Sequence, residues 1–471
     1  MRICDDLRQA VLQAAIQGKL TKQLPEDGSS EDLLKKIATE KAKLIKEGKI
    51  KKEKALPEIS PDEIPFDIPV NWKWVRLDEL CSVVTGRLDA NAQNKSGKYA
   101  FFTCGVEVYR TTDYAFDCDA ILLGGNNASG DYKIHRFCGK FNAYQRVYVI
   151  TNPPKITLDY LFNVIKWWLP SLKHSSQGTT TQFIRLGQVK GMFVPLPPLA
   201  EQHRIVALVE ELMARIDDLE KTETELKKLK AAFPGDMKAA LLQAAMQGKL
   251  TEQLPEDGDA SHLNNQIAKE KNQLIKEGKI KKEKPLPDIT PDEVPFDIPG
   301  NWQWVRLGSI IYNRGQKTPD KDFTYIDISS IDNKVNKLGD LTNILSPNQA
   351  PSRARKIVRN GDIIYATVRP YLHNTCIIDR DILPEPIVST GFAVLSVTKG
   401  IYNRYLFRCL LSPMFDEYAN SNENAKGVAY PAINDAKLLA AYIPLPPLAE
   451  QKRIVEKLDK LLPLCDGLIE E

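Results

Sequence analysis

The sequence predicts an α/β protein with a pseudo-two-fold internal repeat, in which two different α/β domains are joined by a pair of long antiparallel helices. Three observations predict it: a frame near the N-terminus returns 230 residues later, a second frame returns 249 residues later, and the segments between them show almost no resemblance in register. Two nearly identical frames around two dissimilar inserts indicate one scaffold that carries two different binding surfaces.

The first frame is repeated in three blocks. Its second copy agrees at fifteen of seventeen positions over 12–28, at all eleven over 44–54 (LIKEGKIKKEK) and at sixteen of twenty-one over 57–77. The second frame, PLPPLAEQHRIV at 195–206, agrees with its copy at eleven of twelve positions. A plain duplication followed by drift would erode frames and inserts alike, so we favour two frames under common constraint.

A long helix is predicted from Pro198 onward, since prolines fit the start of a helix and apolar residues then recur at helical spacing. The apolar positions are Ile205, Leu208, Leu212, Ile216, Leu219 and Leu226. The second copy stops at Glu471, and the residues that would continue it correspond to the first twenty of the chain. We therefore expect the N-terminal helix to complete the C-terminal one, with the termini meeting, so that two antiparallel rods set the spacing of two binding heads.

These repeats give five predicted segments. They are an N-terminal helical repeat (1–56), a first insert domain (57–197), a central helical scaffold (198–286), a second insert domain (287–446) and a C-terminal helix (447–471) that pairs with the central helix and is completed by the N-terminus. Within the N-terminal repeat, 31–48 reads as a helix that Ser29 or Ser30 can cap.

Each insert mixes short β-type runs with a closing helical stretch, which predicts an α/β domain. The runs are AILLGG (120–125), RVYVI (146–150), DIIYATV (362–368) and FAVLSV (392–397), and the helical stretches are 158–172 and 401–420. Trp72 and Trp74 open the first insert, and we interpret them as core residues rather than as platforms for stacking bases.

Composition is that of an ordinary globular protein, with 43% hydrophobic and 27% charged residues and a net charge of +3. Eight cysteines without a CxxC pair, together with five histidines, argue against a zinc site and suit the reducing cytoplasm, where we expect the protein. The first residues lack the apolar core of a signal peptide. The sequence contains no stretch of 18 apolar residues, so we expect no membrane span.

The candidate nucleic-acid contacts are polar and basic residues of the inserts, because Arg and Gln can fork onto base edges while Ser, Thr and Lys mostly hold phosphates. In the first insert they are Arg87, Lys133, His135, Arg136, Ser175, Gln177, Thr179, Thr180 and Gln182; in the second they are Arg314, Gln316, Lys317, Arg353, Arg355, Lys356, Arg369, Tyr371 and Tyr430. SRARKIVR (352–359) is the densest basic run. Gly178 and Gly427 coincide at the 249-residue offset, which indicates one loop with different side chains on each domain, although a purely structural turn fits equally well.

The chain resembles type I restriction–modification specificity subunits, since both PLPPLAEQ-x-RIV segments follow a variable domain and open a long helix. The resemblance covers essentially the whole chain. It implies a non-catalytic subunit with two target-recognition domains, each reading one half of a bipartite site in double-stranded DNA. It also implies two modification subunits, which hold S-adenosylmethionine and methylate adenine, and two restriction subunits, which use ATP and Mg²⁺. It assigns no cofactor to this chain and no role to KEGKIKKEK, for which phosphate contact and a solvated loop both fit.

Four alternatives stay open. Asn152 to Lys155 (NPPK) approaches the [DN]PP[YF] motif of adenine methyltransferases, but Lys155 stands where an aromatic residue is needed to stack on the base. Asp320, Asp332 and Lys334 loosely fit a nuclease PD…DxK pattern that the first insert lacks. A protein-binding scaffold and the specificity subunit of a two-part system, whose partner both methylates and cleaves, are the other two. No GxxxxGK[ST] loop occurs, so ATP hydrolysis is expected elsewhere.

Overall fold

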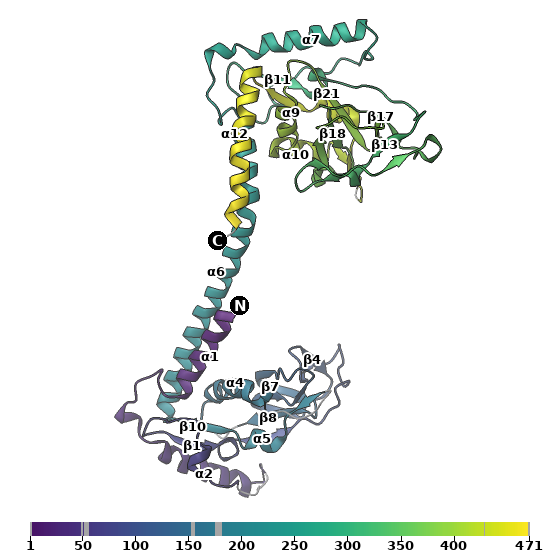
Figure 1. The fold of residues 1–471 in the computed structure, drawn as a ribbon. Coiled ribbons are helices and arrows are strands. Elements are labelled where there is room, and N and C mark those ends of the chain that lie inside the picture. Colours follow the sequence, from purple (N-terminus) through teal and green to yellow (C-terminus); the bar gives the residue numbers. More distant parts are fainter. Residues whose placement is uncertain are drawn as a thin grey trace. The chain divides into compact units, whose positions relative to one another are not determined.

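The structure is a computed structural model that describes residues 2–48, 50, 56–151, 156–174, 181–427 and 429–469. The chain divides into two compact units, Met1–Leu226 and Lys227–Glu471. Helix α6 (Leu199–Met246), predicted from the proline-rich segment, belongs in part to each unit. Each unit has its own hydrophobic core, so each is described by itself (Figure 1).

The first unit is built around one six-stranded sheet. Its order is β2-β8-β5-β7-β3-β4, in which only β3 and β7 run parallel. The strands are β2 (Ser82–Thr85), β3 (Tyr99–Phe102), β4 (Val108–Thr111), β5 (Phe116–Gly124), β7 (Ile134–Ala143) and β8 (Val147–Thr151). A second pair joins β6 (Asn126–Asn127) to β9 (Gln182–Phe183). The helices are α1 (Arg2–Ile16), α2 (Ser30–Lys46), α3 (Leu77–Leu80), α4 (Leu158–His174) and α5 (Leu186–Lys190).

The second unit has a different β architecture, with two four-stranded sheets. One has the order β12-β21-β18-β19 and the other β16-β13-β20-β17. The strands are β12 (Ile311–Tyr312), β13 (Phe323–Ile326), β16 (Ile344–Leu345), β17 (Ala354–Ile357), β18 (Ile363–Ala366), β19 (Thr375–Ile377), β20 (Pro386–Ser389) and β21 (Phe392–Val397). Two hairpins complete it, β14 (Ile331–Asp332) with β15 (Lys337–Leu338) and β22 (Ala425–Lys426) with β23 (Ala432–Ile433). Its helices are α7 (Ala260–Lys276), α8 (Leu307–Ile310), α9 (Asn403–Leu410), α10 (Pro413–Asn420), α11 (Asp435–Ala440) and α12 (Leu448–Asp466).

Both units open and close their insert with the same strand pair. In the first unit β1 (Lys73–Arg76) pairs antiparallel with β10 (Phe193–Leu196); in the second β11 (Gln303–Arg306) pairs with β24 (Tyr442–Leu445) in the same register. Trp72 precedes β1 and is 5% exposed, which confirms it as a core residue. The predicted α/β fold class with an internal repeat is thereby confirmed, although the two inserts arrange their strands differently.

The helices pair within each unit as the repeat requires. In the first unit Arg8 of α1 contacts Asp217 and Glu220 of α6, while Thr21, further along the chain, contacts Glu201, so α1 and α6 run antiparallel (Figure 1). In the second unit Lys238 of α6 contacts Asp466 of α12. The expected meeting of the two termini stays a prediction.

The predicted apolar stripe of α6 is only partly buried. Ile205 and Ile216 of the predicted apolar stripe are buried, but Leu219 is 41% and Leu226 is 51% exposed. The stripe follows helical spacing throughout, yet only its N-terminal part faces the core of the first unit.

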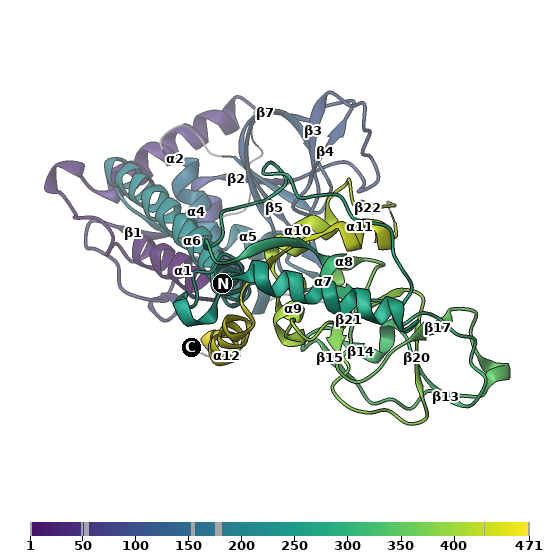
Figure 2. The ribbon, with the colours of Figure 1, turned by 90° about the horizontal axis from the view of Figure 1, so that it is seen from above.

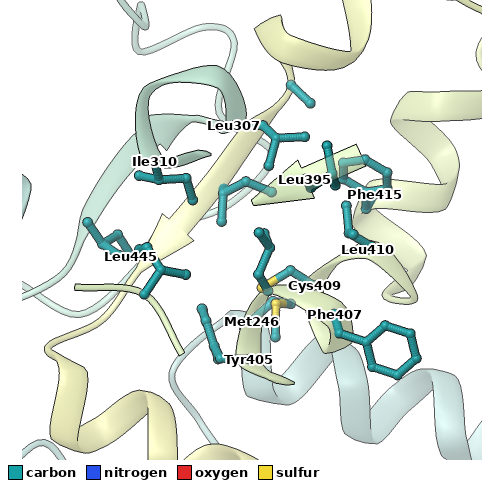
Figure 3. Close-up of a cluster of buried hydrophobic side chains, with 14 of the residues drawn as sticks. Met246, Leu307, Ile310, Leu395, Tyr405, Phe407, Cys409, Leu410, Phe415 and Leu445 are labelled. Carbon is teal, nitrogen blue, oxygen red and sulfur yellow. The ribbon is translucent and has the colours of Figure 1, made fainter. Parts of the chain in front are cut away.

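The cores join the helical frame to each insert domain. In the second unit Met246 at the end of α6 packs with Leu307 and Ile310 of α8, Tyr405 of α9 and Leu445 of β24 (Figure 3). Leu12, Ala15 and Ile16 of α1 contribute to the corresponding cluster of the first unit. Frame and insert therefore fold as one body in each unit. No helix among the described residues is long and apolar enough to cross a membrane.

A buried glutamate ties the frame to the strand pair in each unit. Glu201 of α6 is fully buried, and its carboxylate accepts hydrogen bonds from Thr21 (3.1 Å), Gln23 (2.9 Å) and Trp72 (2.9 Å). Glu450 of α12 repeats this arrangement at 3.0, 2.9 and 2.8 Å with the corresponding residues, Thr251, Gln253 and Trp302. We call each set the glutamate clamp.

Candidate nucleic-acid interface

Three predicted residues of the first domain lie at one end of β7, and two of them are held by acidic partners. Arg136 donates to Asp119 of β5 (Nη2 to Oδ2, 2.7 Å) and to Asp159 of α4 (Nε to Oδ1, 3.1 Å). Lys133 pairs with Asp131. The His135 ring lies 2.9 Å from the carbonyl oxygen of Gly105. Two carboxylates therefore already hold the Arg136 guanidinium in this conformation.

Arg87 lies elsewhere on the first domain. Its backbone N–H donates to Ala143 O at the other end of β7 (3.0 Å), and its side chain is exposed. Ala143 lies seven residues after Arg136 on this strand, which is about 23 Å at 3.3 Å per residue. The structure thus does not bring Arg87 together with the residues around Arg136.

Gln182 lies on β9, opposite Asn127 of β6. This pair fixes the loop after β5, and Ile184 N donates to Gly125 O at 3.0 Å to extend the attachment. Gly130 adopts φ +69° beside the Gln182 side chain, where any Cβ would collide with the amide oxygen. The predicted Ser175, Gln177, Thr179 and Thr180 lie outside the described residues, as do Gly178 and the NPPK segment (152–155).

In the second domain the densest basic run does not form one patch. Residues 354–357 are strand β17, whose side chains alternate between faces. Lys356 points inward, is 6% exposed and lies 3.8 Å from the Asp435 carboxylate. Arg353 is exposed and Arg355 is half-buried. The period of the strand therefore divides a cluster that looks continuous in the sequence.

Two predicted residues between β12 and β13 are likewise paired with carboxylates. Arg314 forms a two-pronged contact with the buried Asp362 at 2.7 and 3.0 Å. Lys317 contacts Glu385 at 2.6 Å, and this hydrogen bond raises the pKa of Lys317. Gln316 forms an isolated antiparallel β-bridge with Lys356, and its side chain is exposed. Arg314 and Lys317 thus hold the fold together in this conformation.

Two predicted residues, Arg369 and Tyr430, do come together at a turn after β18, and a third, Tyr371, lies in the same turn. Arg369 lies over the Tyr430 ring, with its Cζ 4.3 Å from the ring centroid. The Arg369 backbone N–H donates to Pro431 O at 2.7 Å, which docks the 429–431 loop onto the turn. Tyr430 is 67% exposed, and Tyr371, two residues after Arg369 in the same turn, is 49% exposed, so both phenol rings reach the surface. We call Arg369, Tyr371 and Tyr430 the aromatic–arginine cluster.

The backbone of this turn is strained. Arg369 (φ +50°) and His373 (φ +51°) both adopt the left-handed conformation, which costs a non-glycine residue about 1–2 kcal/mol. His373 Nε2 lies 2.6 Å from Asp416 Oδ1, and Asn336 donates to His373 O at 2.7 Å. The Nε atom of Arg369 is buried without a hydrogen-bond partner among the described residues. Strain of this kind collects at binding sites, where surrounding contacts maintain it.

The supporting residues His373, Asp416 and Asn336 were not expected from the sequence. No local signal marks them, because their role depends on a turn whose left-handed residues are not glycines. The alternative nuclease residues are engaged locally: Asp320 contacts Lys317, and the Asp332 carboxylate accepts the backbone N–H of Lys334. Across the described part of the chain no group of three or more His, Cys, Asp or Glu is placed to hold a metal ion.

Comparison with known proteins gives consistent matches. The family model described as the type I restriction modification DNA specificity domain matches residues 69–230 and 299–471. The type I restriction enzyme EcoAI specificity subunit of Escherichia coli is 29% identical, over 98% of this chain and 89% of its own length. The EcoDI specificity subunit of Escherichia coli is 30% identical, over 85% and 83%. A crystal structure of the HsdS subunit from Thermoanaerobacter tengcongensis is 21% identical over 86% of this chain and 92% of its own, with a TM-score of 0.37.

Proposed function

Because this chain belongs to the family of type I restriction–modification DNA specificity domains, we propose that it selects the DNA sequence on which a type I complex acts. Each α/β domain reads one half of a bipartite target, and the helices set the spacer. One observation carries this proposal: the strand pair and the glutamate clamp are repeated in both units, whereas one insert forms a six-stranded sheet and the other forms two four-stranded sheets. Shared attachment with different reading surfaces suits two half-sites of different sequence.

The chain acts as a recognition subunit and leaves the chemistry to its partners. We propose two modification subunits, which hold S-adenosylmethionine and methylate adenine, and two restriction subunits, which use ATP and Mg²⁺. The complex assembles in the cytoplasm, where the cellular DNA is. The scaffold and two-part alternatives are less favoured, since the relatives named above are specificity subunits of type I enzymes.

The helices are the proposed docking surface for the modification subunits. In the first unit Ile3 of α1 is 63% exposed, and in the second Leu229 and Phe233 of α6 are 68% and 47% exposed. Exposed apolar side chains at helical spacing mark surfaces that bind other helices.

For the second domain, the aromatic–arginine cluster is the proposed base-reading site. An Arg guanidinium can fork onto the O6 and N7 atoms of guanine, and the ring beneath it keeps the fork in one plane. Tyr371 and Tyr430 offer faces for sugar or base contact. Lys133, Arg136, Arg314 and the other predicted contacts remain candidates of lower rank, because ion pairs hold several of them.

The test is to map adenine methylation in cells that express the chain with its partner subunits. The wild type is expected to give a bipartite motif. Arg369→Ala with Tyr430→Ala is expected to lower discrimination at one or two bases of one half-site by about 1–3 kcal/mol for a lost bidentate contact, with the other half unchanged. Arg380→Ala, an exposed arginine of the same domain, serves as the control. A motif unaffected by the double substitution would remove the cluster from the reading surface, and methylation independent of this chain would refute the proposed function.

A further inference from the structure

The repeated segment LIKEGKIKKEK is more constrained than its packing explains. Its two copies, 44–54 and 274–284, are identical at all eleven positions. The helical residues just before them, 31–43 and 261–273, agree at only five of thirteen. The chain therefore contains a region of drift directly beside a region of identity.

In this helix, most of the positions that are identical in the two copies make packing contacts or hydrogen bonds within the fold. Ile267 of α7 is 1% exposed, and Leu263 packs on the same core. The Lys271 ammonium donates a hydrogen bond to Gly308 O at 2.6 Å, and the Glu270 carboxylate accepts one from the Lys399 backbone N–H at 3.0 Å. These four are among the five positions that the two copies share, so contacts within the fold account for them.

In 274–284, by contrast, most of the positions that are identical in the two copies are not packed against the rest of the fold. Only Leu274, Ile275 and Ile280 are partly buried, while the other eight residues are exposed. In the preceding helix every exposed position but Ala268 differs between the two copies, so exposure alone would have let these residues diverge too. The positive φ of Gly278 accounts for that one position, and a constraint outside the described fold is needed for the other seven.

The segment has a defined place in the second unit. Gly278 (φ +69°) ends α7, where the Lys279 N–H donates to Leu274 O at 3.0 Å. The chain then turns back along α7 toward β11 (Figures 1 and 2). Arg306 fixes the far end by donating to Pro287 O and Asp288 O, both at 3.1 Å. We call residues 279–286 the lysine strap.

A groove of about 850 Å³ separates the strap from α7 and β11. The strap is thus attached at its ends and stands away from the domain between them. Ile280 and Leu286 of the strap are partly buried, whereas its four lysines are exposed.

The strap concentrates positive charge. Each copy of the repeated segment has five Lys and two Glu, a net charge of +3, which equals that of the whole chain. Lys279 contacts Glu277 at 2.7 Å, a surface pair of little energetic weight. Lys281, Lys282 and Lys284 make no ion pair with any residue that the structure describes.

We propose that the lysine strap binds the phosphodiester backbone of DNA outside the base-reading loops, in a sequence-independent contact that rests on the proposed function. Two domains that read different bases cannot share base contacts, but they can share phosphate contacts, since the backbone is the same at every sequence. Lysine ammoniums are suited to phosphates as point charges. A protein partner is the weaker explanation, because Lys and Glu are depleted at protein interfaces.

The test compares two quadruple variants of the full chain in complex with its partner subunits. One carries Lys279→Gln, Lys281→Gln, Lys282→Gln and Lys284→Gln; the control carries arginine at the same four positions. Binding is measured to a duplex with the target motif and to one without it, at several salt concentrations.

The glutamine variant is expected to lose affinity for both duplexes by the same factor. The slope of log K against log salt should become shallower by about 0.9 for each lost phosphate contact, with the methylation motif unchanged and the arginine variant near wild type. Unaltered affinity and slope would overturn the proposal. So would loss of partner assembly with intact DNA binding, which would identify a protein-docking segment. If the wild type does not prefer the target duplex, the proposed function fails. The proposal about the strap is tested separately, by comparing the affinities of the wild type and the glutamine variant for the duplex without the motif.

Discussion

Glu201 and Glu450 each bring a carboxylate into a fully buried place, where an unpaired charge would be costly. Three donors converge on each carboxylate, from an indole, an amide and a hydroxyl. The donors come from the N-terminal part of the frame and from the residue before the first strand. One buried side chain thus joins helix, loop and strand pair in each unit.

Replacing this glutamate should destabilise its own unit. Glu201→Ala leaves the buried Trp72 N–H without an acceptor, so we expect a loss of about 1–3 kcal/mol in the free energy of unfolding. Glu450→Ala should cost a similar amount through Trp302, and Glu210→Ala, at an exposed position of α6, should stay within about 0.5 kcal/mol. Urea unfolding followed by tryptophan fluorescence measures all three, and an unchanged transition in Glu201→Ala would contradict the role of the clamp.

A second repeated pair gives a pH dependence. Arg204 donates to Asp27 and holds the pKa of that carboxyl below its usual range, and Arg453 does the same for Asp257. Because the folded-state pKa is the lower one, the stability that the pairs add is complete above the unfolded value of about 4 and is lost as the pH falls through the folded value.

The double variant Asp27→Asn, Asp257→Asn should therefore lose less stability than the wild type when the pH is lowered from about 5 to about 2 to 3. Denaturant midpoints at a series of pH values measure this. Parallel curves for variant and wild type would show that the two pairs add no pH-dependent stability.

At the scale of elements, periodicity decides which charges reach the surface. The run 352–359 looks like a single basic patch, but β17 turns Lys356 into the interior and leaves Arg353 outside. Helix α6 shows the same effect, since its apolar stripe continues beyond the residues that the core of the first unit covers. The sequence shows the period of a strand or helix, but it does not show how much of that element other parts of the fold bury.

The uncovered part of α6 leads to a prediction about assembly. Leu229→Asp with Phe233→Asp should leave the fold intact, because both side chains are exposed, and should reduce co-purification with the modification subunit by at least tenfold, about 1.4 kcal/mol. Ala231→Asp with Gly235→Asp adds the same charge at exposed positions on the opposite face of the helix and is the control. Equal recovery of partner with both variants would place docking elsewhere.

At the scale of the whole molecule, the two units attach different domains in the same way. The register of β1 with β10 equals that of β11 with β24, and the clamps have matching distances. A domain that fits one frame should therefore fit the other.

This equivalence predicts that the inserts can be exchanged. A chain in which 77–192 replaces 307–441 should fold and should direct methylation to a motif whose two halves carry the same bases. Methylome sequencing of cells that express the chimera and its partners checks this. A folded chimera that retains the wild-type motif would show that the inserts do not choose the bases.

The sequence by itself determined the repeat and the helix that begins after Pro198, because these depend on local pattern and on comparison of the chain with itself. It also placed RVYVI and FAVLSV in strands and Trp72 in the core. Tertiary structure alone decided that one insert forms a six-stranded sheet and the other two four-stranded sheets, since strand pairing joins residues far apart in the chain. It also decided that Arg369 meets Tyr430 while Arg136 and Arg314 are held by carboxylates. A side chain's charge is written in the sequence, but its freedom to bind a ligand depends on neighbours that only the folded chain supplies.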